Sequence, residues 1–309
     1  MSNKPLVSIG LPTYNRAATL GRAIESALDQ DYQNIELLIS DNASTDETEA
    51  ICLGAARHDN RIKYLRQQTN QGAIANFREV LRQSGGEFFM WLADDDWLDP
   101  SYLSTCVEFL MSNPDHMLAC GTTRYFDNER FVFADTEIDL WQNSRTKRLL
   151  AYYNQVSWNG ALYGLMRREP LLDIGIQETL GADWFFVSDV AFTGKVKTIS
   201  RVAINRSLKG ASRDMSALAA LFDVSGFMLR NPHLKVALNA WKNIFWWSPA
   251  YAALSLPARL FLASRVFAII CRRFIFERWY GRVVSRIIES HPRVKRAAKL
   301  VKSKLAIRS

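Results

Sequence analysis

The sequence lacks the residue clusters that usually mark a disulfide, zinc or phosphate-loop site. Its four cysteines show no C-x-x-C spacing and its four histidines are scattered. This favours buried thiols in a reducing compartment over disulfides or a zinc centre. There is no G-x-G-x-x-G after the first predicted strand and no G-x-x-x-x-G-K-[ST] anywhere. The standard dinucleotide fingerprint and the P-loop are therefore excluded.

Long apolar runs are also missing. The N-terminal stretch MSNKPLVSIG has no extended apolar region, so we expect no secretory signal and a cytoplasmic protein. The uncharged run 243–258 spans 16 residues and contains two prolines. A membrane-spanning helix needs about 20 apolar residues, so this run predicts none.

Charge is divided unevenly along the chain. The 309 residues carry a net charge of +8, but residues 232–309 hold sixteen Lys and Arg against two Glu. The rest of the chain is therefore acidic. Such a division indicates two roles in one polypeptide. Nucleic acid is an unlikely partner, because the body is acidic and no nucleic-acid-binding motif is present.

Strand and helix patterns alternate along the first half of the chain. Short apolar runs occur at 6–11, 35–40, 61–66 and 88–92. A polar turn and a helical pattern follow each of the first three runs, and an acidic turn follows the fourth. This order predicts βαβ units in a doubly wound, mostly parallel α/β sheet, similar to a Rossmann fold. Ligands of such sheets bind outside the carboxyl ends of the strands, where the polar turns gather.

The most informative stretch is WLADDDWLDP, residues 91–100. Asp94, Asp95 and Asp96 directly follow the predicted strand. Adjacent carboxylates repel one another unless a cation offsets their charge. Mg²⁺ typically takes one or two carboxylates and leaves room for substrate phosphates. The alternative is a solvated acidic loop that caps the helix after Pro100.

Four motifs together carry a family resemblance. PTYNR (12–16), ELLISDNASTD (36–46), NQGAIANF (70–77) and WLADDDW (91–97) resemble, in order and spacing, the family 2 glycosyltransferases of the GT-A fold. The resemblance covers roughly residues 5–200. It implies a nucleotide-diphosphate-sugar donor, a hydroxyl acceptor, an inverting reaction and a Mg²⁺ or Mn²⁺ cofactor.

The resemblance also implies roles for individual residues. Asp41 would bind the base or ribose of the nucleotide, and Asp96 would coordinate the metal on the diphosphate. The implied donor-binding residues are Pro12, Tyr14, Asn15, Asp41, Asp94 and Asp95. The alternative for Asp41 is a structural role in an Asx turn or as a helix N-cap, and we favour the nucleotide-binding role.

The expected general base lies in GADWFFVSDV, residues 181–190. The family usually carries an acidic pair there, and this chain has Ala182-Asp183. Asp183 is therefore the candidate that takes the proton of the acceptor hydroxyl. The alternative is that Asp183 caps the following helix. Asp189 is the weaker substitute for the base, or lies on the solvent face of that helix.

The second half is less informative. We expect an irregular segment over 127–147, an extended segment over 157–166 and a last strand over 194–199. Where the family often has a His, this chain has Asn205-Arg206-Ser207, and Arg206 is expected to be solvated rather than at the diphosphate. No Q-x-x-R-W motif follows the base, which favours transfer of a single sugar over processive synthesis.

We predict a catalytic domain at 1–230 and a basic, helical appendage at 231–309. From Phe276 to Ile287, a helical period places apolar residues on one face and arginines on the opposite face. Such a helix suits a cytoplasmic membrane interface, where a lipid-linked acceptor in cell-surface polysaccharide or glycolipid synthesis would lie. The alternative is packing of this stripe on the body. Two other functions remain open: a nucleotidyltransferase, and a membrane-docked nucleotide-sugar-binding protein with a decayed site.

Overall fold

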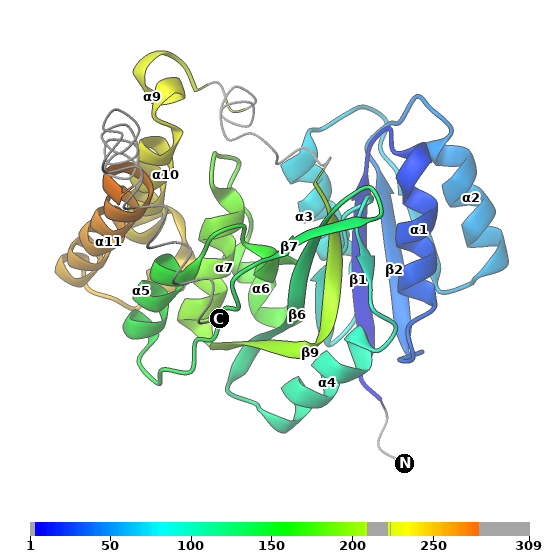
Figure 1. Ribbon diagram of the computed structural model, residues 1–309, viewed down its shortest axis with the longest axis horizontal. Helices are drawn as coiled ribbons and strands as arrows, with labels where there is room; N and C mark the ends of the chain where they lie inside the picture. Colours follow the sequence, from blue (N-terminus) through cyan, green and yellow to red (C-terminus); the bar gives the residue numbers. More distant parts are fainter. Residues whose placement is uncertain (1–3, 209–221, 223, 278–309) are drawn as a thin grey trace, which may run out of the picture.

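The computed structural model describes residues 4–208, 222 and 224–277 (Figure 1). Within these ranges the strands form one sheet in the order β3-β2-β1-β4-β8-β6-β9-β5, and β7 pairs with β6. The strands are β1 (Val7–Thr13), β2 (Ile35–Asp41), β3 (Ile62–Arg66), β4 (Phe88–Trp91), β5 (Trp97–Leu98), β6 (His116–Asp127), β7 (Arg130–Ala134), β8 (Leu165–Arg167) and β9 (Lys195–Ser207).

The first four long strands are parallel, as predicted. β1 pairs with β2 on one side and β4 on the other, and β2 pairs with β3. The connecting helices are α1 (Ala17–Leu28), α2 (Thr48–His58) and α3 (Ala73–Gln83). Every residue of β1 and β2 is buried, which is typical of a parallel sheet covered on both faces. The predicted α/β fold is confirmed, and it leaves the polar strand ends at one edge.

The second half contains more regular structure than expected. The segment 127–147 holds β7 and the start of α5 (Arg145–Gln155), and 157–166 holds the 3₁₀ turn η1 (Gly160–Tyr163) and enters β8. β9 continues to Ser207 instead of ending near 199. Its pairing with β6 shifts register after Gly121. The polar side chains at its end form hydrogen bonds with residues that are more than 100 positions away in the sequence. Local propensity cannot reveal such partners.

The remaining helices pack around this half of the sheet. They are α4 (Tyr102–Ser112), α6 (Arg168–Ile174), α7 (Ala182–Thr193), α9 (Gly226–Arg230), α10 (Pro232–Lys242) and α11 (Leu256–Cys271), with the turns η2 (Asn243–Trp247), η3 (Pro249–Tyr251) and η4 (Arg272–Phe276). In Figure 1, α10 and α11 lie beside α5 and α7, on the side of the molecule away from α1 and α2.

The basic C-terminal segment packs on the body over its described part. Asp189 of α7 is 2% exposed and accepts hydrogen bonds from Tyr251 Oη at 2.6 Å and from Asn243 Nδ2 at 3.0 Å. Asp189 is therefore not on a solvent face, because two groups of the later chain bury and bind it. Most of the amphipathic stripe expected over 276–287 lies outside the described residues. Within the described ranges, none of the helices has both the length and the hydropathy needed to cross a membrane.

Candidate donor-binding and catalytic site

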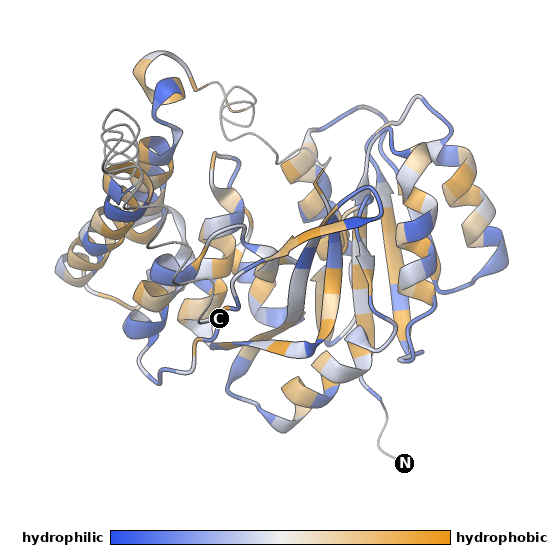
Figure 2. Ribbon diagram, viewed as in Figure 1, coloured by the Kyte–Doolittle hydropathy of each residue, from blue (hydrophilic) through white to orange (hydrophobic). Residues whose placement is uncertain are grey.

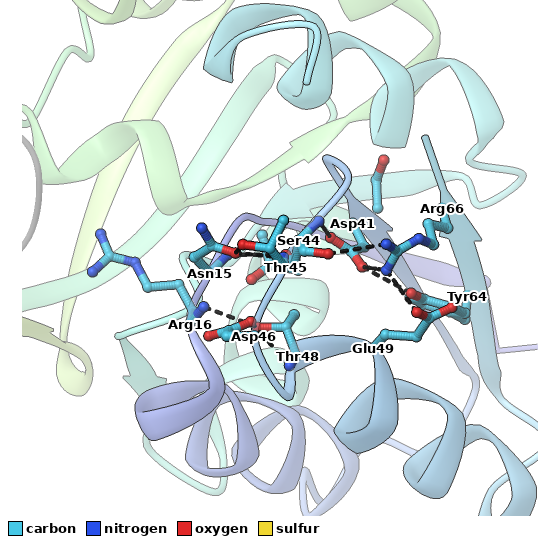
Figure 3. A network of polar contacts seen from close by, with 12 residues as sticks. Asn15, Arg16, Asp41, Ser44, Thr45, Asp46, Thr48, Glu49, Tyr64 and Arg66 are labelled. Atoms are coloured by element: carbon cyan, nitrogen blue, oxygen red, sulfur yellow. Dashed lines mark hydrogen bonds and ion pairs between the residues drawn. The ribbon is translucent and has the colours of Figure 1, made fainter. Parts of the chain in front are cut away.

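The loops that follow β1 and β2 are joined to each other by hydrogen bonds (Figure 3). Asn15 adopts a left-handed conformation with φ of 53°. Its backbone N–H donates to Ser44 Oγ at 2.9 Å, and its side-chain oxygen accepts from the N–H of Thr45 at 2.8 Å. Asp46 accepts from the N–H of Ala17, the first residue of α1, at 3.1 Å. The two loops therefore form one preorganised surface at the strand ends.

Asp41 is fully buried at the end of β2 and is fully partnered (Figure 3). One carboxylate oxygen accepts from the N–H of Ser44 at 2.8 Å, which is the turn-capping role that the residues alone allowed. The other accepts from Tyr64 Oη at 2.9 Å and Arg66 Nη1 at 3.1 Å. Asp41 thus has a structural function, and its carboxylate lies directly beneath the surface made by the two loops.

Arg16 connects this surface to the three consecutive aspartates 94–96, which we call the acidic run. Its N–H donates to Thr48 Oγ1 at 2.9 Å, and its guanidinium Nε lies 3.4 Å from Asp94 Oδ1. Burial raises the pKa of Asp94 to about 7, and the charge of Arg16 opposes that shift. Tyr14, two residues before Arg16, is 42% exposed and available to a ligand, whereas Pro12 is buried within β1.

Asp96 forms a buried ion pair with Arg206. It is 1% exposed, and Oδ2 accepts from Arg206 Nε at 2.7 Å while Oδ1 accepts from the N–H of Ser207 at 3.1 Å. Burial raises the pKa of Asp96 to about 6. The Arg206 guanidinium also lies 4.3 Å from the centroid of the Tyr163 ring. The expectation that Arg206 is solvated is wrong, because β9 extends far enough to bring it under the acidic run.

The residues present can be tested against a bound Mg²⁺ or Mn²⁺. Three consecutive carboxylates supply the oxygen ligands that these hard cations take, and one or two suffice when phosphates complete the shell. Asp95 is partly exposed and makes no hydrogen bond to the residues that the structure describes. No group of three or more His, Cys, Asp or Glu in the described ranges is arranged to hold a metal. The chemistry therefore fits a cation shared with phosphate, not one caged by protein alone.

Asp183 occupies the first turn of α7, two residues after the N-cap Gly181, whose φ is 90°. It is partly exposed, and burial of its carboxyl raises its pKa. Its Oδ2 accepts a hydrogen bond from Asn159 Nδ2 at 3.1 Å. A carboxyl that is partly accessible and easily protonated has the properties of a general base.

The structure brings Asp96 and Asp183 to the same place. The positive charge of Arg206 acts on the carboxyl groups of both residues. Tyr163 links the two residues: its ring lies under the Arg206 guanidinium that pairs with Asp96, and its 3₁₀ turn η1 begins directly after Asn159, which donates to Asp183. One site at the strand ends therefore contains the acidic run and the candidate base.

Comparison with known proteins identifies the family. The family model described as "Glycosyl transferase family 2" matches residues 8–175, which is more than half of the chain. The chain belongs to glycosyl transferase family 2.

Two curated relatives match parts of this glycosyl transferase family 2 chain. One is the GalNAc(5)-diNAcBac-PP-undecaprenol beta-1,3-glucosyltransferase of Campylobacter jejuni, which is 39% identical over 105 residues, or 34% of each chain. The other is WcaA of Escherichia coli K12, named for colanic acid biosynthesis, which is 39% identical over 186 residues, or 60% of this chain and 66% of WcaA. The matches thus span between about a third and two thirds of these relatives.

Solved structures support the fold. The S. aureus TarS structure in complex with UDP-GlcNAc superposes with a TM-score of 0.60 at 18% identity, over 87% of this chain and 73% of TarS. The mannosyltransferase PcManGT of Pyrobaculum calidifontis, in complex with GDP-Man and Mn²⁺, superposes with a TM-score of 0.56 at 16% identity, over 96% and 84% of the two chains. Both likenesses confirm the GT-A fold.

Several residues of the site were not predicted from sequence. Tyr64 and Arg66 hold Asp41, and Asn159 contacts Asp183. A signal for Arg66 was present in the sequence. β2 and β3 are parallel neighbours, and their register places Arg66 beside Asp41. No comparable signal existed for Asn159, which lies on an irregular segment.

Proposed function

We propose that this protein transfers a single sugar from a nucleotide diphosphate sugar to a hydroxyl acceptor with inversion at the anomeric carbon. The observation that carries the proposal is the convergence of the acidic run and Asp183 on one site at the sheet edge of a family 2 fold. The joined loops around Asn15 and Asp41 would bind the nucleoside, with Tyr14, Asp94 and Asp95 completing the donor site.

The residues divide the chemistry between them. Asp96 would hold Mg²⁺ or Mn²⁺, which when bound offsets the charge of the donor diphosphate. Asp183 takes the proton of the acceptor hydroxyl while the hydroxyl oxygen forms a bond to the anomeric carbon. At the same time, the bond between that carbon and the oxygen of the nucleotide diphosphate breaks. The nucleoside diphosphate leaves with that electron pair. Arg206, which is buried and paired with Asp96, offsets negative charge in the site.

The acceptor we propose is a lipid-linked glycan in polysaccharide or glycolipid synthesis at a cytoplasmic membrane surface. Within residues 224–277 there are seven Lys and Arg against the single Glu277. Trp246 of η2 is 63% exposed and Phe261 of α11 is 65% exposed, and α11 carries hydrophobic and hydrophilic residues along its length (Figure 2). Exposed aromatics among unopposed basic residues suit an interface with anionic lipid. The Campylobacter relative, by its name, acts on an undecaprenol-linked glycan.

Calorimetry with UDP-GlcNAc, UDP-glucose, UDP-galactose and GDP-mannose, each with and without Mn²⁺, tests the donor site. We expect one donor to bind, and Mn²⁺ to tighten its binding. Asp96→Asn should abolish the effect of Mn²⁺ while the protein stays folded. Asp183→Asn should bind donor as tightly as the wild type and fail in transfer, because it lacks the proton acceptor. The absence of binding by every donor under both conditions would instead support a decayed site.

A further inference from the structure

One buried residue next to the proposed base has an unusual backbone. Among the described non-glycine residues, four have positive φ: Asn15, Ala43, Asn128 and Asn159. Asn159, with φ of 56°, is the buried one, at 1% exposure. A buried left-handed residue persists where its surroundings determine it, and such residues cluster at functional sites. Asn159 therefore calls for an explanation beyond turn formation.

The turn around Asn159 is held on several sides. Asp135 accepts hydrogen bonds from Ser157 Oγ and from the N–H of Gly160. A Cβ at Gly160 would lie 2.0 Å from Thr123 Oγ1, so this turn is pressed against β6. The backbone position of Asn159 is thus set by β6 and the segment after β7, and its side chain is left to point toward α5 and α7.

The side chain of Asn159 bridges two groups. Its oxygen accepts from Tyr152 Oη of α5 at 2.8 Å, and its Nδ2 donates to Asp183 Oδ2 of α7 at 3.1 Å. An ionised carboxylate can only accept, so the amide nitrogen must face Asp183 and the amide oxygen must face the hydroxyl. Tyr152 is fully buried, which fixes this orientation.

We propose that Asn159, anchored by Tyr152, is the positioning residue that orients Asp183 and keeps it ionised for proton abstraction. The inference rests on the proposed function, in which Asp183 is the base. A donor fixed on Oδ2 holds the carboxylate in one orientation. It also opposes the effect of burial, since a hydrogen bond to the charged form lowers the pKa of a carboxyl.

Other charged and titratable groups also act on this site. Those whose charges interact with Asp183 are Tyr152 and Tyr153 of α5, Tyr163 of η1 and Arg206 of β9. Arg206 is already paired with Asp96. Asn159 is a neutral side chain that donates to the Asp183 carboxylate, beside the backbone N–H of Trp184, so its removal should change Asp183 without removing a charge.

The test uses variants that separate the amide from the backbone. Asn159→Gly keeps a residue that adopts positive φ freely and removes the side chain that carries the amide. Asn159→Asp replaces the donor with an acceptor, and Tyr152→Phe removes the anchor. Asn128→Gly is the matched control, because Asn128 has φ of 54° and lies in the exposed turn between β6 and β7. Urea unfolding verifies that each variant is folded.

The primary readout is the carbon-13 carboxyl titration of Asp183 in the ligand-free protein, assigned by the loss of its signal in Asp183→Asn. We expect the midpoint to rise by about one pH unit in Asn159→Gly, since a hydrogen bond to a charged group is worth roughly a tenfold factor. Asn159→Asp should raise it further, Tyr152→Phe should raise it less, and Asn128→Gly should leave it unchanged. An unchanged midpoint in both Asn159 variants overturns the proposal.

The second readout is the pH dependence of UDP release from UDP-GlcNAc and of GDP release from GDP-mannose. The acid limb should move to higher pH by the same amount as the titration, with donor affinity unchanged. A shifted titration with an unshifted rate profile would overturn the positioning role by showing that Asp183 is not the base. That result would locate the failure in the proposed function, whereas an unmoved titration locates it in Asn159.

Discussion

Arg206 Nε lies 2.7 Å from Asp96 Oδ2, so a cation of the chain itself neutralises the carboxylate to which we assign the metal. The pair is buried: the Arg206 side chain is 12% exposed and that of Asp96 is 1% exposed. A divalent cation that binds Asp96 must therefore compete with Arg206 or share the carboxylate with it. This relationship leads to the first prediction.

Replacing Arg206 by Gln should increase the stabilisation that Mn²⁺ alone gives to the protein. The variant loses about 3–5 kcal/mol of stability, because a buried carboxylate is left without its partner. Mn²⁺ can then restore the missing charge, and binding to the folded state raises the melting temperature. Thermal unfolding with and without MnCl₂ measures the effect.

Arg201→Gln is the control for this experiment. Arg201 lies on the same strand and pairs with Glu108 at 3.2 Å, but both side chains are more than 60% exposed. Its replacement should change neither the stability nor the response to Mn²⁺ appreciably. An equal Mn²⁺ response in the wild type and the Arg206 variant would count against Asp96 as the metal ligand.

Asp41→Asn should destabilise the fold as well as weaken nucleotide binding. Ser44, Tyr64 and Arg66 all donate to this fully buried carboxylate. Loss of its charge and one acceptor should cost about 1–3 kcal/mol in urea unfolding. Glu49→Gln, which removes an exposed partner of Arg66 at 2.8 Å, should cost much less. Equal losses in the two variants would contradict a structural role for Asp41.

Asp189 should make stability depend on pH. Burial raises its pKa to about 6, above the value of about 3.9 expected in the unfolded chain. The folded state therefore binds the proton more tightly. Its stabilising contribution is complete below about pH 4 and is lost as the pH rises through about 6, by an amount on the order of 2 kcal/mol.

The difference in unfolding free energy between the wild type and Asp189→Asn isolates this contribution. The difference should fall between about pH 4 and pH 6 and stay constant above about pH 7, because only the wild type titrates there. Asp173→Asn, at an exposed position of α6, is the matched control substitution. A difference that does not change with pH would mean that Asp189 titrates normally in the folded protein.

Substituting Trp246 and Phe261 together by Ser should weaken binding to phosphatidylglycerol vesicles by roughly thirtyfold or more, since each buries apolar surface worth about 1–2 kcal/mol in an interface. Sedimentation with vesicles measures the loss. Trp141→Ser is the control, because Trp141 is 71% exposed at a different place in the fold. Equal binding of the double variant and the wild type would reject this surface as the membrane contact.

The first half of the fold was predictable because its signals are local. Apolar runs that alternate with helical periods specify parallel strands, and the carboxyl ends of parallel strands meet at one edge. The predicted sheet, its polar edge and the family motifs within residues 8–175 are therefore confirmed. The later segments were predicted less well, because β7 and the end of β9 owe their strand structure to pairing with β6 rather than to a local pattern.

By itself, the sequence determined the α/β fold, the family and the position of the acidic run at a strand end. Only the tertiary structure decided what surrounds that run: Arg206 lies 110 residues from Asp96, and Asn159 lies 24 residues from Asp183. The physical reason is that a buried charge requires a partner, but nothing in the local pattern says which distant residue supplies it. Folding made that choice when β9 and the turn before η1 came to lie against the same site.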